Sequence, residues 1–273
     1  MSAGSSTEHS PVESIFRAAK AEGRGTLVGY LPAGYPTVDG SVDLLNALVE
    51  GGCDLLEVGI PYSDPVMDGP TIQAAADKAL RAGTRLRDVL SVVERVSAAG
   101  GRAVIMTYYN PLQRYGIDAF ARDLAAAGGL GVITPDLIPD EADDWLAASE
   151  AHGLDRIFLV APSSTEERIA STATATRGFL YATSTMGVTG ARDAVAATAP
   201  QIVARCRAHT DLPIGVGLGV RSADQAAEVA SFADGVIAGA AFVTAAETGG
   251  AEGVRALAAE LAAGVRRAAP QPV

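Results

Sequence analysis

The segment Asp54-Leu-Leu-Glu-Val-Gly-Ile60 decides the fold of this 273-residue chain. Its apolar residues form a continuous run and do not alternate with polar ones, as in a strand whose two faces are both buried. Seven other runs rich in Val, Ile, Leu and Ala have the same character. Together the runs predict eight strands of a parallel sheet, at residues 26–33, 54–60, 103–109, 131–135, 156–161, 178–183, 213–217 and 235–239.

Amphipathic stretches between these strands predict helices at residues 42–50, 117–126, 141–152, 166–173 and 223–229. A further helix at 12–22 precedes the first strand, and helices at 71–82 and 86–98 both follow the second. The pattern predicts an α/β protein, a single-domain (β/α)8 TIM barrel with extra helices before strand 1 and in the second βα unit. The main alternative is an open doubly wound sheet, but the strand count and the lack of a Gly-rich turn after the first strand argue against it.

No linker rich in Pro or Ser and no change of composition divides the chain. Residues 11–273 are therefore expected to form one domain, after a flexible N-terminal tail at residues 1–10. The tail has neither the positive start nor the apolar core of an export signal. Residues 235–246, the longest apolar stretch, are fewer than the roughly 20 residues that a membrane helix needs.

The composition excludes several classes of partner. The formal net charge is −11 and the sequence pI is about 4.7, so the chain would repel nucleic acids and anionic membrane surfaces. Cys53 and Cys206 are the only cysteines, and each lies beside an apolar segment. Two thiols so far apart in sequence are expected to be buried and reduced, which favours a cytoplasmic protein.

Carboxylates cluster at the end of the second predicted strand, where a parallel barrel carries its reactive groups. Glu57 lies within the apolar strand, and burial there would raise its pKa toward a value useful for proton transfer. Asp68 follows in a loop with Gly69 and Pro70. Each also has a structural interpretation, Glu57 as a core carboxylate with satisfied hydrogen bonds and Asp68 as a helix N-cap.

Three glycine-containing stretches follow later strands, at residues 186–190, 215–219 and 238–241. Glycines after the seventh and eighth strands lie where barrels commonly bind phosphate through backbone N–H groups at a helix N-terminus. The alternative is that these glycines only permit tight turns, since Gly215-Val-Gly-Leu-Gly219 is not a dinucleotide fingerprint. Their place in the barrel favours a small-molecule phosphate substrate.

Groups for two common kinds of carbon–carbon chemistry are missing. The only lysines, Lys20 and Lys78, lie on predicted helices, so no lysine stands at a strand end to form a Schiff base. The three histidines are scattered, which argues against a catalytic metal, and no metal is expected. Glu57 and Asp68 therefore remain as the candidate acid and base.

Several segments together resemble the tryptophan synthase α subunit family. The most specific is Glu57-Val-Gly-Ile-Pro-Tyr-Ser-Asp-Pro-Val-Met-Asp-Gly-Pro-Thr-Ile-Gln73, and the resemblance extends from Ser14 to the end of the eighth strand. Other matches are Tyr30-Leu-Pro-Ala-Gly-Tyr-Pro36, Met106-Thr-Tyr-Tyr-Asn-Pro111, Ala161-Pro-Ser-Ser-Thr165, Tyr181-Ala-Thr-Ser-Thr-Met-Gly-Val-Thr-Gly190 and Gly217-Leu-Gly219. The family is a carbon–carbon lyase that cleaves indole-3-glycerol phosphate to indole and glyceraldehyde 3-phosphate in tryptophan biosynthesis.

The resemblance implies roles for individual residues. Glu57 would protonate indole C3 and serve the glycerol hydroxyl, while Asp68 would hold the indole N–H. Tyr181 resembles the aromatic residue beside the active-site carboxylate. The wall of the indole pocket would be formed by Tyr30, Tyr108 and Leu218, although plain core packing is the alternative for each aromatic residue.

The resemblance also implies a mobile lid at residues 186–193, in which Thr189 would contact the Asp68 loop. The backbone donors to the phosphate would be those of Gly190, Gly219 and Gly239. The next residue departs from the family, because Ala240 stands where the family usually has Ser. The loss of that hydroxyl predicts weaker phosphate binding.

The family works as an αββα heterotetramer, and indole passes from the α subunit to a β subunit that condenses it with serine. The α chain itself needs no cofactor, since pyridoxal phosphate belongs to the β partner. Asn110, Pro111 and the pair Asp64-Pro65 match the region that faces the β subunit, although the sequence alone identifies them as turn residues. Two other functions stay open at this point, an isomerase of another sugar phosphate and a non-catalytic subunit that activates a β partner.

Overall fold

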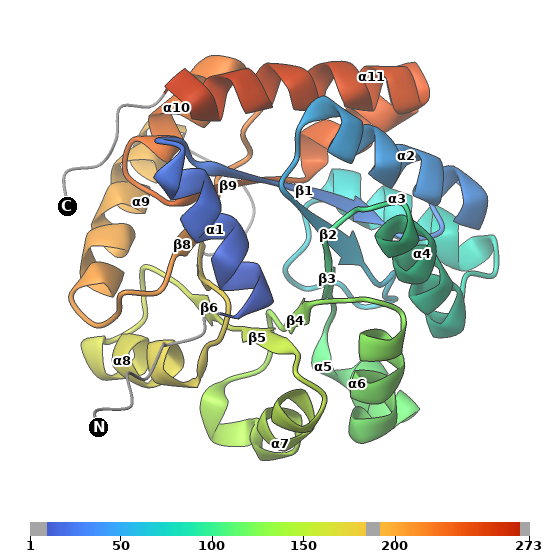
Figure 1. The fold of residues 1–273 in the computed structure, drawn as a ribbon, viewed down its shortest axis with the longest axis horizontal. Coiled ribbons are helices and arrows are strands. Elements are labelled where there is room, and N and C mark those ends of the chain that lie inside the picture. The colour runs from blue at the N-terminus through green and yellow to red at the C-terminus, as the bar shows by residue number, and fades with distance from the viewer. Residues whose placement is uncertain (1–9, 184–191, 268–273) are drawn as a thin grey trace, which may run out of the picture.

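A computed structural model describes residues 10–183 and 192–267 of the chain as a parallel β-barrel surrounded by helices (Figure 1). The strands pair in the order β5-β4-β3-β2-β1-β9-β8-β7-β6. Only Phe158 separates β5 from β6 along the chain, so the two ends of the ladder meet and the sheet closes. The strand bounds are β1 (Thr26–Pro32), β2 (Leu55–Gly59), β3 (Ala103–Met106), β4 (Gly131–Ile133), β5 (Asp155–Ile157), β6 (Leu159–Val160), β7 (Leu180–Thr183), β8 (Ile214–Gly217) and β9 (Gly235–Ala238).

The barrel confirms the predicted fold class, with one of the eight predicted strands divided. The expected strand at 156–161 is split into β5, which pairs with β4, and β6, which pairs with β7. The third strand is shorter than expected, because it ends at Met106 and a helix begins at Tyr109. Pro111 lies in the first turn of that helix, where its missing N–H breaks no helical hydrogen bond.

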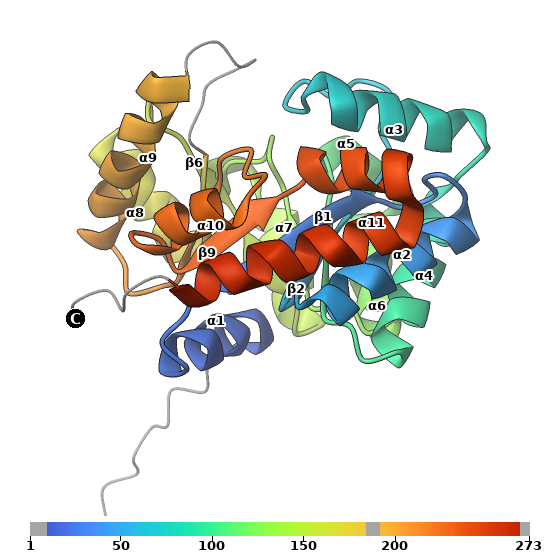
Figure 2. The same cartoon turned by 90° about the horizontal axis from the view of Figure 1, so that it is seen from above.

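Helices cover the outside of the barrel and both of its ends (Figures 1 and 2). Figure 2 shows α1 across one end and α3 at the opposite end. Within the described part of the chain, no helix is long and apolar enough to span a bilayer. The helices are α1 (Pro11–Ala21), α2 (Val38–Gly51), α3 (Pro70–Arg81), α4 (Leu86–Ala98), α5 (Tyr109–Tyr115), α6 (Ile117–Ala126), α7 (Asp143–Ala151), α8 (Glu166–Ala175), α9 (Arg192–Arg207), α10 (Ala223–Ala230) and α11 (Ala240–Arg267), with a 3-10 turn at Pro139–Glu141.

Two of these helices, α5 and α9, are not among the predicted ones, and only the start of α11 is predicted, since residues 235–246 resemble a buried strand that runs into a helix. Helix α9 contains Pro200, and α11 changes direction at Gly250, whose φ is +56°. In a sequence, a proline or a glycine indicates that a helical pattern is interrupted. The extra helices before strand 1 and in the second unit are confirmed as α1, α3 and α4.

The barrel interior holds a layer of buried side chains from α1, from strands β1 to β5 and β9, and from the residue before β7. Phe16 of α1 packs beneath Gly235, where a Cβ would lie 2.5 Å from the Phe16 ring. Since side chains alternate along a strand, the inward position of Leu55 directs Glu57 into the same interior. The core side chains in this layer are Val12, Ile15, Phe16, Val28, Leu55, Val104, Ile133, Ile157, Phe179 and Ile237.

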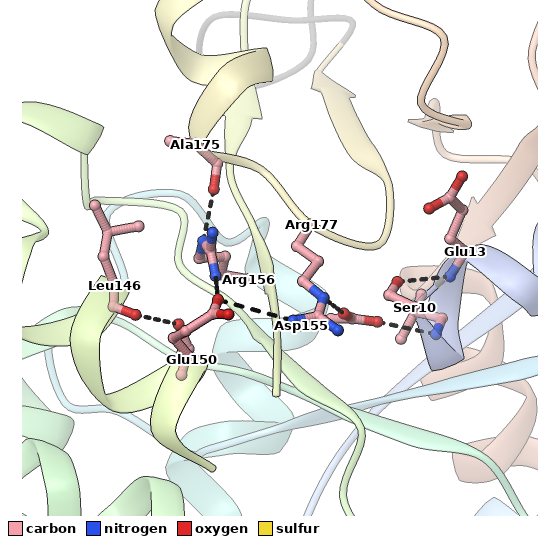
Figure 3. Close-up of polar contacts among 10 residues, drawn as sticks. Ser10, Glu13, Leu146, Glu150, Asp155, Arg156, Ala175 and Arg177 are labelled. Carbon is pink, nitrogen blue, oxygen red and sulfur yellow. Dashed lines mark hydrogen bonds and ion pairs between the residues drawn. The ribbon is translucent and has the colours of Figure 1, made fainter. Parts of the chain in front are cut away.

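The N-terminal end of the barrel holds a buried carboxylate, Asp155 at the start of β5 (Figure 3). Its Oδ2 accepts a hydrogen bond of 2.9 Å from the backbone N–H of Val12, at the start of α1. Its Oδ1 lies 3.2 Å from Nε of Arg177. Ser10 caps the same helix by accepting from the N–H of Glu13, so Asp155 and Ser10 together fasten α1 to the barrel.

Two other aspartates at this end have the same kind of partners. Asp54 accepts from the N–H of Leu27 at 2.9 Å and from both terminal nitrogens of Arg24, at 2.8 and 2.9 Å. Asp234 accepts from the N–H of Ile214 at 2.8 Å and pairs with an arginine, Arg207. Carboxylates at the strand starts thus accept hydrogen bonds from backbone N–H groups and pair with guanidinium groups.

Candidate active site

Glu57 lies in β2 at the C-terminal half of the barrel, between Tyr30 of β1 and Val104 of β3. Its side chain is only 1% exposed, and Oε2 has no hydrogen-bond partner among the described residues. Burial, and secondly the charge of Asp68, raises the pKa of Glu57 to about 8. Glu57 is therefore not a core carboxylate with satisfied hydrogen bonds, and it holds a proton at neutral pH.

Asp68 lies in the loop between β2 and α3 and is half-buried. Burial raises the pKa of this carboxyl to about 6. The N-cap of α3 is Gly69, and no side chain caps that helix, so the interpretation of Asp68 as an N-cap is wrong. The loop is held in place by Nε2 of Gln73, which donates to the carbonyl oxygen of Asp68 at 2.8 Å.

Tyr30 and Tyr181 reach the same interior from β1 and β7, and glycines on the neighbouring strands make room for them. A Cβ on Gly59 would lie 2.4 Å from the hydroxyl oxygen of Tyr30. A Cβ on Gly217 would lie 2.5 Å from that of Tyr181. Tyr108 follows β3, and its hydroxyl accepts a hydrogen bond of 2.8 Å from the N–H of Met67, next to Asp68.

The causes of the pKa shifts indicate that these side chains lie close to one another. Burial is the largest cause that raises the pKa of Tyr30, and the charges of Asp68 and Glu57 raise it further. The same three causes raise the pKa of Tyr181. Burial also raises the pKa of Tyr108 to about 12, with Asp68 among the smaller causes. The structure thus brings together five of the predicted site residues from three strands and two loops.

Further side chains near Glu57 are not among the predicted site residues. Met106 of β3 and Leu159 of β6 are partly buried and pack against the interior layer, as Tyr181 does. Met106 lies two residues after the inward-facing Val104, so the alternation along the strand could have identified it. Ile72 of α3 also approaches the site, 3.5 Å from the position of a Cβ on Gly239.

The predicted phosphate residues lie at two adjacent strand ends. Gly219 follows β8 and has a φ of +64°, which favours glycine. Gly239 follows β9, and Ala240 is the first residue of α11, so backbone N–H groups at a helix N-terminus are near. Leu218 is partly buried there. The other predicted contacts, Thr189 and Gly190 in the lid, lie outside the described residues.

The described residues contain no group of three His, Cys, Asp or Glu side chains that could hold a metal ion. Two histidines contact single carboxylates on the surface, and Cys53 and Cys206 are free and buried. A groove of about 610 Å³ lies on the outer face between α6 and α7, lined by residues that include Asp118 and Asp144. It contains none of the predicted site residues, so the cluster of side chains around Glu57 remains the candidate site.

Comparisons with known proteins agree over nearly the whole chain. A family model described as tryptophan synthase alpha chain matches residues 16–269. A protein named tryptophan synthase alpha chain from Nocardia farcinica is 65% identical over 262 residues, which are 96% of this chain and 98% of that protein. One of the same name from Mycobacterium tuberculosis is 65% identical over 260 residues, which are 95% and 96% of the two chains.

Solved structures show the same correspondence. A structure of tryptophan synthase from Mycobacterium tuberculosis has a TM-score of 0.90 at 64% identity and covers 95% of this chain and 99% of that chain. A tryptophan synthase alpha chain from Legionella pneumophila has a TM-score of 0.84 at 32% identity, covering 94% and 98%. The similarity therefore extends over every strand of the barrel and over the loops that carry the candidate site.

Proposed function

The chain belongs to the tryptophan synthase alpha chain family, and on that premise we propose that Glu57 and Asp68 carry the reaction. As a member of this family the chain is a lyase of tryptophan biosynthesis, which cleaves indole-3-glycerol phosphate to indole and glyceraldehyde 3-phosphate. The observation that carries the assignment of residues is the buried, unpartnered Oε2 of Glu57 beside a second carboxylate. Perturbed carboxyl groups in one cavity are typical of catalytic acids and bases.

The protonation states suit the cleavage. With a pKa of about 8, Glu57 carries a proton at neutral pH and can give it to C3 of the indole ring. The bond between C3 and the glycerol carbon then breaks, its electrons return to the ring, and Glu57 takes the proton of the glycerol hydroxyl as the aldehyde forms. The ring itself accepts the bonding electrons, so the step uses only groups of the chain and substrate.

Asp68 has a different task. With a pKa of about 6, it is mainly ionised at neutral pH. Its carboxylate would accept a hydrogen bond from the indole N–H and stabilise the positive charge that develops on the protonated ring. That interaction is stronger in the transition state than in the ground state, so it lowers the barrier.

The remaining site residues would bind the substrate. The indole ring would pack against Tyr30, Tyr108, Tyr181 and Leu218, all of them aromatic or apolar. Thr189 would contact the Asp68 loop when the lid covers the site. The phosphate would lie at the ends of β8 and β9, bound by the backbone at Gly190, Gly219, Gly239 and Ala240. Gly219 and Gly239 support this part of the proposal by their positions.

A tryptophan synthase β subunit is the proposed partner, in an αββα heterotetramer in the cytoplasm. The loop that carries Asp68 supports this, because it exposes two large apolar side chains, Val66 at 81% and Met67 at 50%. Apolar side chains exposed beside an active site are typical of a protein interface. Asn110, Pro111 and the pair Asp64-Pro65 belong to the same proposed surface. Pyridoxal phosphate would be bound by the β subunit, and no cofactor is proposed for this chain.

The experiment that tests the proposed function is the release of indole by the purified chain from indole-3-glycerol phosphate, with and without a β subunit. We expect indole in both cases and no turnover of pentose phosphates. Turnover of pentose phosphates without indole would favour the sugar-phosphate isomerase. The non-catalytic alternative predicts no indole release by the wild type, and it is excluded if Glu57→Gln keeps β activation but loses indole release.

A further inference from the structure

Two polar groups of the site lack partners and lie on neighbouring strands. One is Oε2 of Glu57, which is buried without a hydrogen bond. The other is the hydroxyl of Tyr30, which makes no hydrogen bond with the described residues. Tyr30 and Glu57 are Cα partners in the ladder between β1 and β2. An unpaired carboxylate oxygen in the interior is unfavourable, so the Tyr30 hydroxyl on the neighbouring strand is a candidate donor to Oε2 once Glu57 has given up its proton.

The orientation of the Tyr30 ring brings its polar end to the side of Glu57. A Cβ on Gly59 would lie 2.4 Å from the Tyr30 hydroxyl oxygen and 2.7 Å from Cε2 of the ring. Gly59 is two residues beyond Glu57 on β2 and therefore on the same face of the strand. On its other edge, Cδ1 of the ring lies 3.2 Å from a Cβ on Gly239. The ring spans from β9 to β2, and its hydroxyl lies at the β2 end.

The charged and titratable groups around this hydroxyl come from every neighbouring element. Asp68 of the β2–α3 loop has the largest electrostatic effect on the pKa of Tyr30, followed by Glu57 of β2, Tyr108 after β3 and Tyr181 of β7. All four raise it, which means that all oppose ionisation of the phenol. The Tyr30 hydroxyl therefore stays neutral and can act as a hydrogen-bond donor to a carboxylate.

We propose that Tyr30 is a positioning residue whose hydroxyl donates a hydrogen bond to the ionised member of the Glu57 and Asp68 pair. This rests on the proposed function of those carboxylates. It also goes beyond the apolar wall that the family resemblance assigns to Tyr30. A donor to the charged form of a carboxyl lowers its pKa. The hydroxyl thus opposes the effect of burial and fixes which oxygen faces the substrate.

Tyr30→Phe tests this role, because it keeps the ring and removes only the hydroxyl oxygen. The carboxyl groups are titrated by carbon NMR in protein labelled at Asp and Glu, with and without indole bound, and Glu57→Gln and Asp68→Asn assign the two signals. We expect the lower apparent pKa of the pair to rise by about one pH unit. We also expect kcat for indole release to fall about tenfold while KM changes less than about twofold, as for a group that acts on positioning.

Tyr35→Phe is the matched control. Tyr35 is also a buried tyrosine, but its ring lies under Nζ of Lys78, 5.5 Å from the ring centre, on the loop after β1. The proposal is overturned if a folded Tyr30→Phe variant titrates like the wild type, or if Tyr35→Phe moves the same pKa equally. A wild-type chain that releases no indole would overturn the proposed function instead and would leave the titration comparison intact.

Discussion

Buried carboxylates have different surroundings at the two ends of the barrel. At the N-terminal end, Asp155 accepts a hydrogen bond from Val12 and pairs with Arg177 (Figure 3). At the C-terminal end, Glu57 is just as deeply buried, but its Oε2 has neither a hydrogen bond nor an ion pair, whereas Oδ1 of Asp155, which also lacks a hydrogen bond, is ion-paired with Arg177. Burial is the largest cause of a raised pKa for both. At Asp155 the donors oppose it, whereas at Glu57 the neighbouring charge of Asp68 adds to it.

The difference shows what each end does. A carboxylate with donors on its oxygens holds the fold together, because removal of one partner leaves a buried charge or donor unpaired. A carboxylate without donors contributes nothing to stability in its charged form, and its pKa stays in the range useful for proton transfer. Substitutions at the N-terminal end should therefore change stability, and substitutions at the C-terminal end should change activity.

Glu57→Gln should have the largest effect. It removes the proton donor while keeping the size of the side chain, so kcat for indole release should fall by about 10² to 10⁴. Stability should not fall, since a neutral amide replaces a buried group that has no ionic partner. Steady-state kinetics and urea unfolding measure the two quantities. A variant that keeps full activity, or that unfolds under native conditions, would contradict the comparison.

The pH dependence of stability should test the comparison between the two ends of the barrel more sharply. The pKa of Glu57 rises from its ordinary value of 4.5 to about 8 on folding, so the folded state binds the proton more tightly than the unfolded chain. Its contribution to stability is present below about pH 4.5 and is lost as pH rises toward 8, by an amount on the order of 4 kcal/mol. Glu57→Gln should therefore gain stability over the wild type across this window. A stability difference that is flat from pH 5 to pH 8 would contradict the raised pKa.

Asp155→Ala should have the opposite effect to Glu57→Gln, because it should lower stability and leave activity nearly unchanged. It leaves the N–H of Val12 and the guanidinium of Arg177 without their buried acceptor, so the free energy of unfolding should fall by about 2 to 3 kcal/mol. The value of kcat/KM should stay within about twofold of the wild type at a temperature where the variant is folded. Urea unfolding and the indole assay test both points. Asp140→Ala, on the exposed surface, is a control that should leave both unchanged within error.

Ala240→Ser should have the smallest effect. It adds a hydroxyl at the first position of α11, where the phosphate is proposed to bind. One new hydrogen bond to the phosphate would contribute about 0.5 to 2 kcal/mol and lower KM accordingly, with kcat little changed. A KM that stays the same or increases would show that the phosphate binds elsewhere.

Much of this barrel could be predicted because its strands are buried on both faces, which leaves continuous apolar runs in the sequence. The division at Phe158 could not, since it depends on which neighbour each half of the strand pairs with. Helix α9 continues through Pro200, whose local preference is overruled in the fold, whereas Gly250 does interrupt α11, and a second helical segment follows it.

The candidate site, like the barrel, could be predicted in part from the sequence. Glu57 and Asp68 stand out because carboxylates at a barrel strand end are chemically informative. Met106 and Leu159 do not carry a chemical signal of this kind, and only the alternation along β3 could have identified Met106. The lack of a partner for Glu57 also depends on the fold, because the residues around it come from distant parts of the sequence.

A double-mutant cycle on kcat tests the central claim most directly, that Glu57 and Asp68 act on one substrate in one step. It compares indole release by the wild type, Glu57→Gln, Asp68→Asn and the variant with both changes. We predict that the double variant is about as slow as the slower single variant, because groups that work as a unit have non-additive effects. Losses that multiply would contradict the claim and would mean that the two carboxylates act independently.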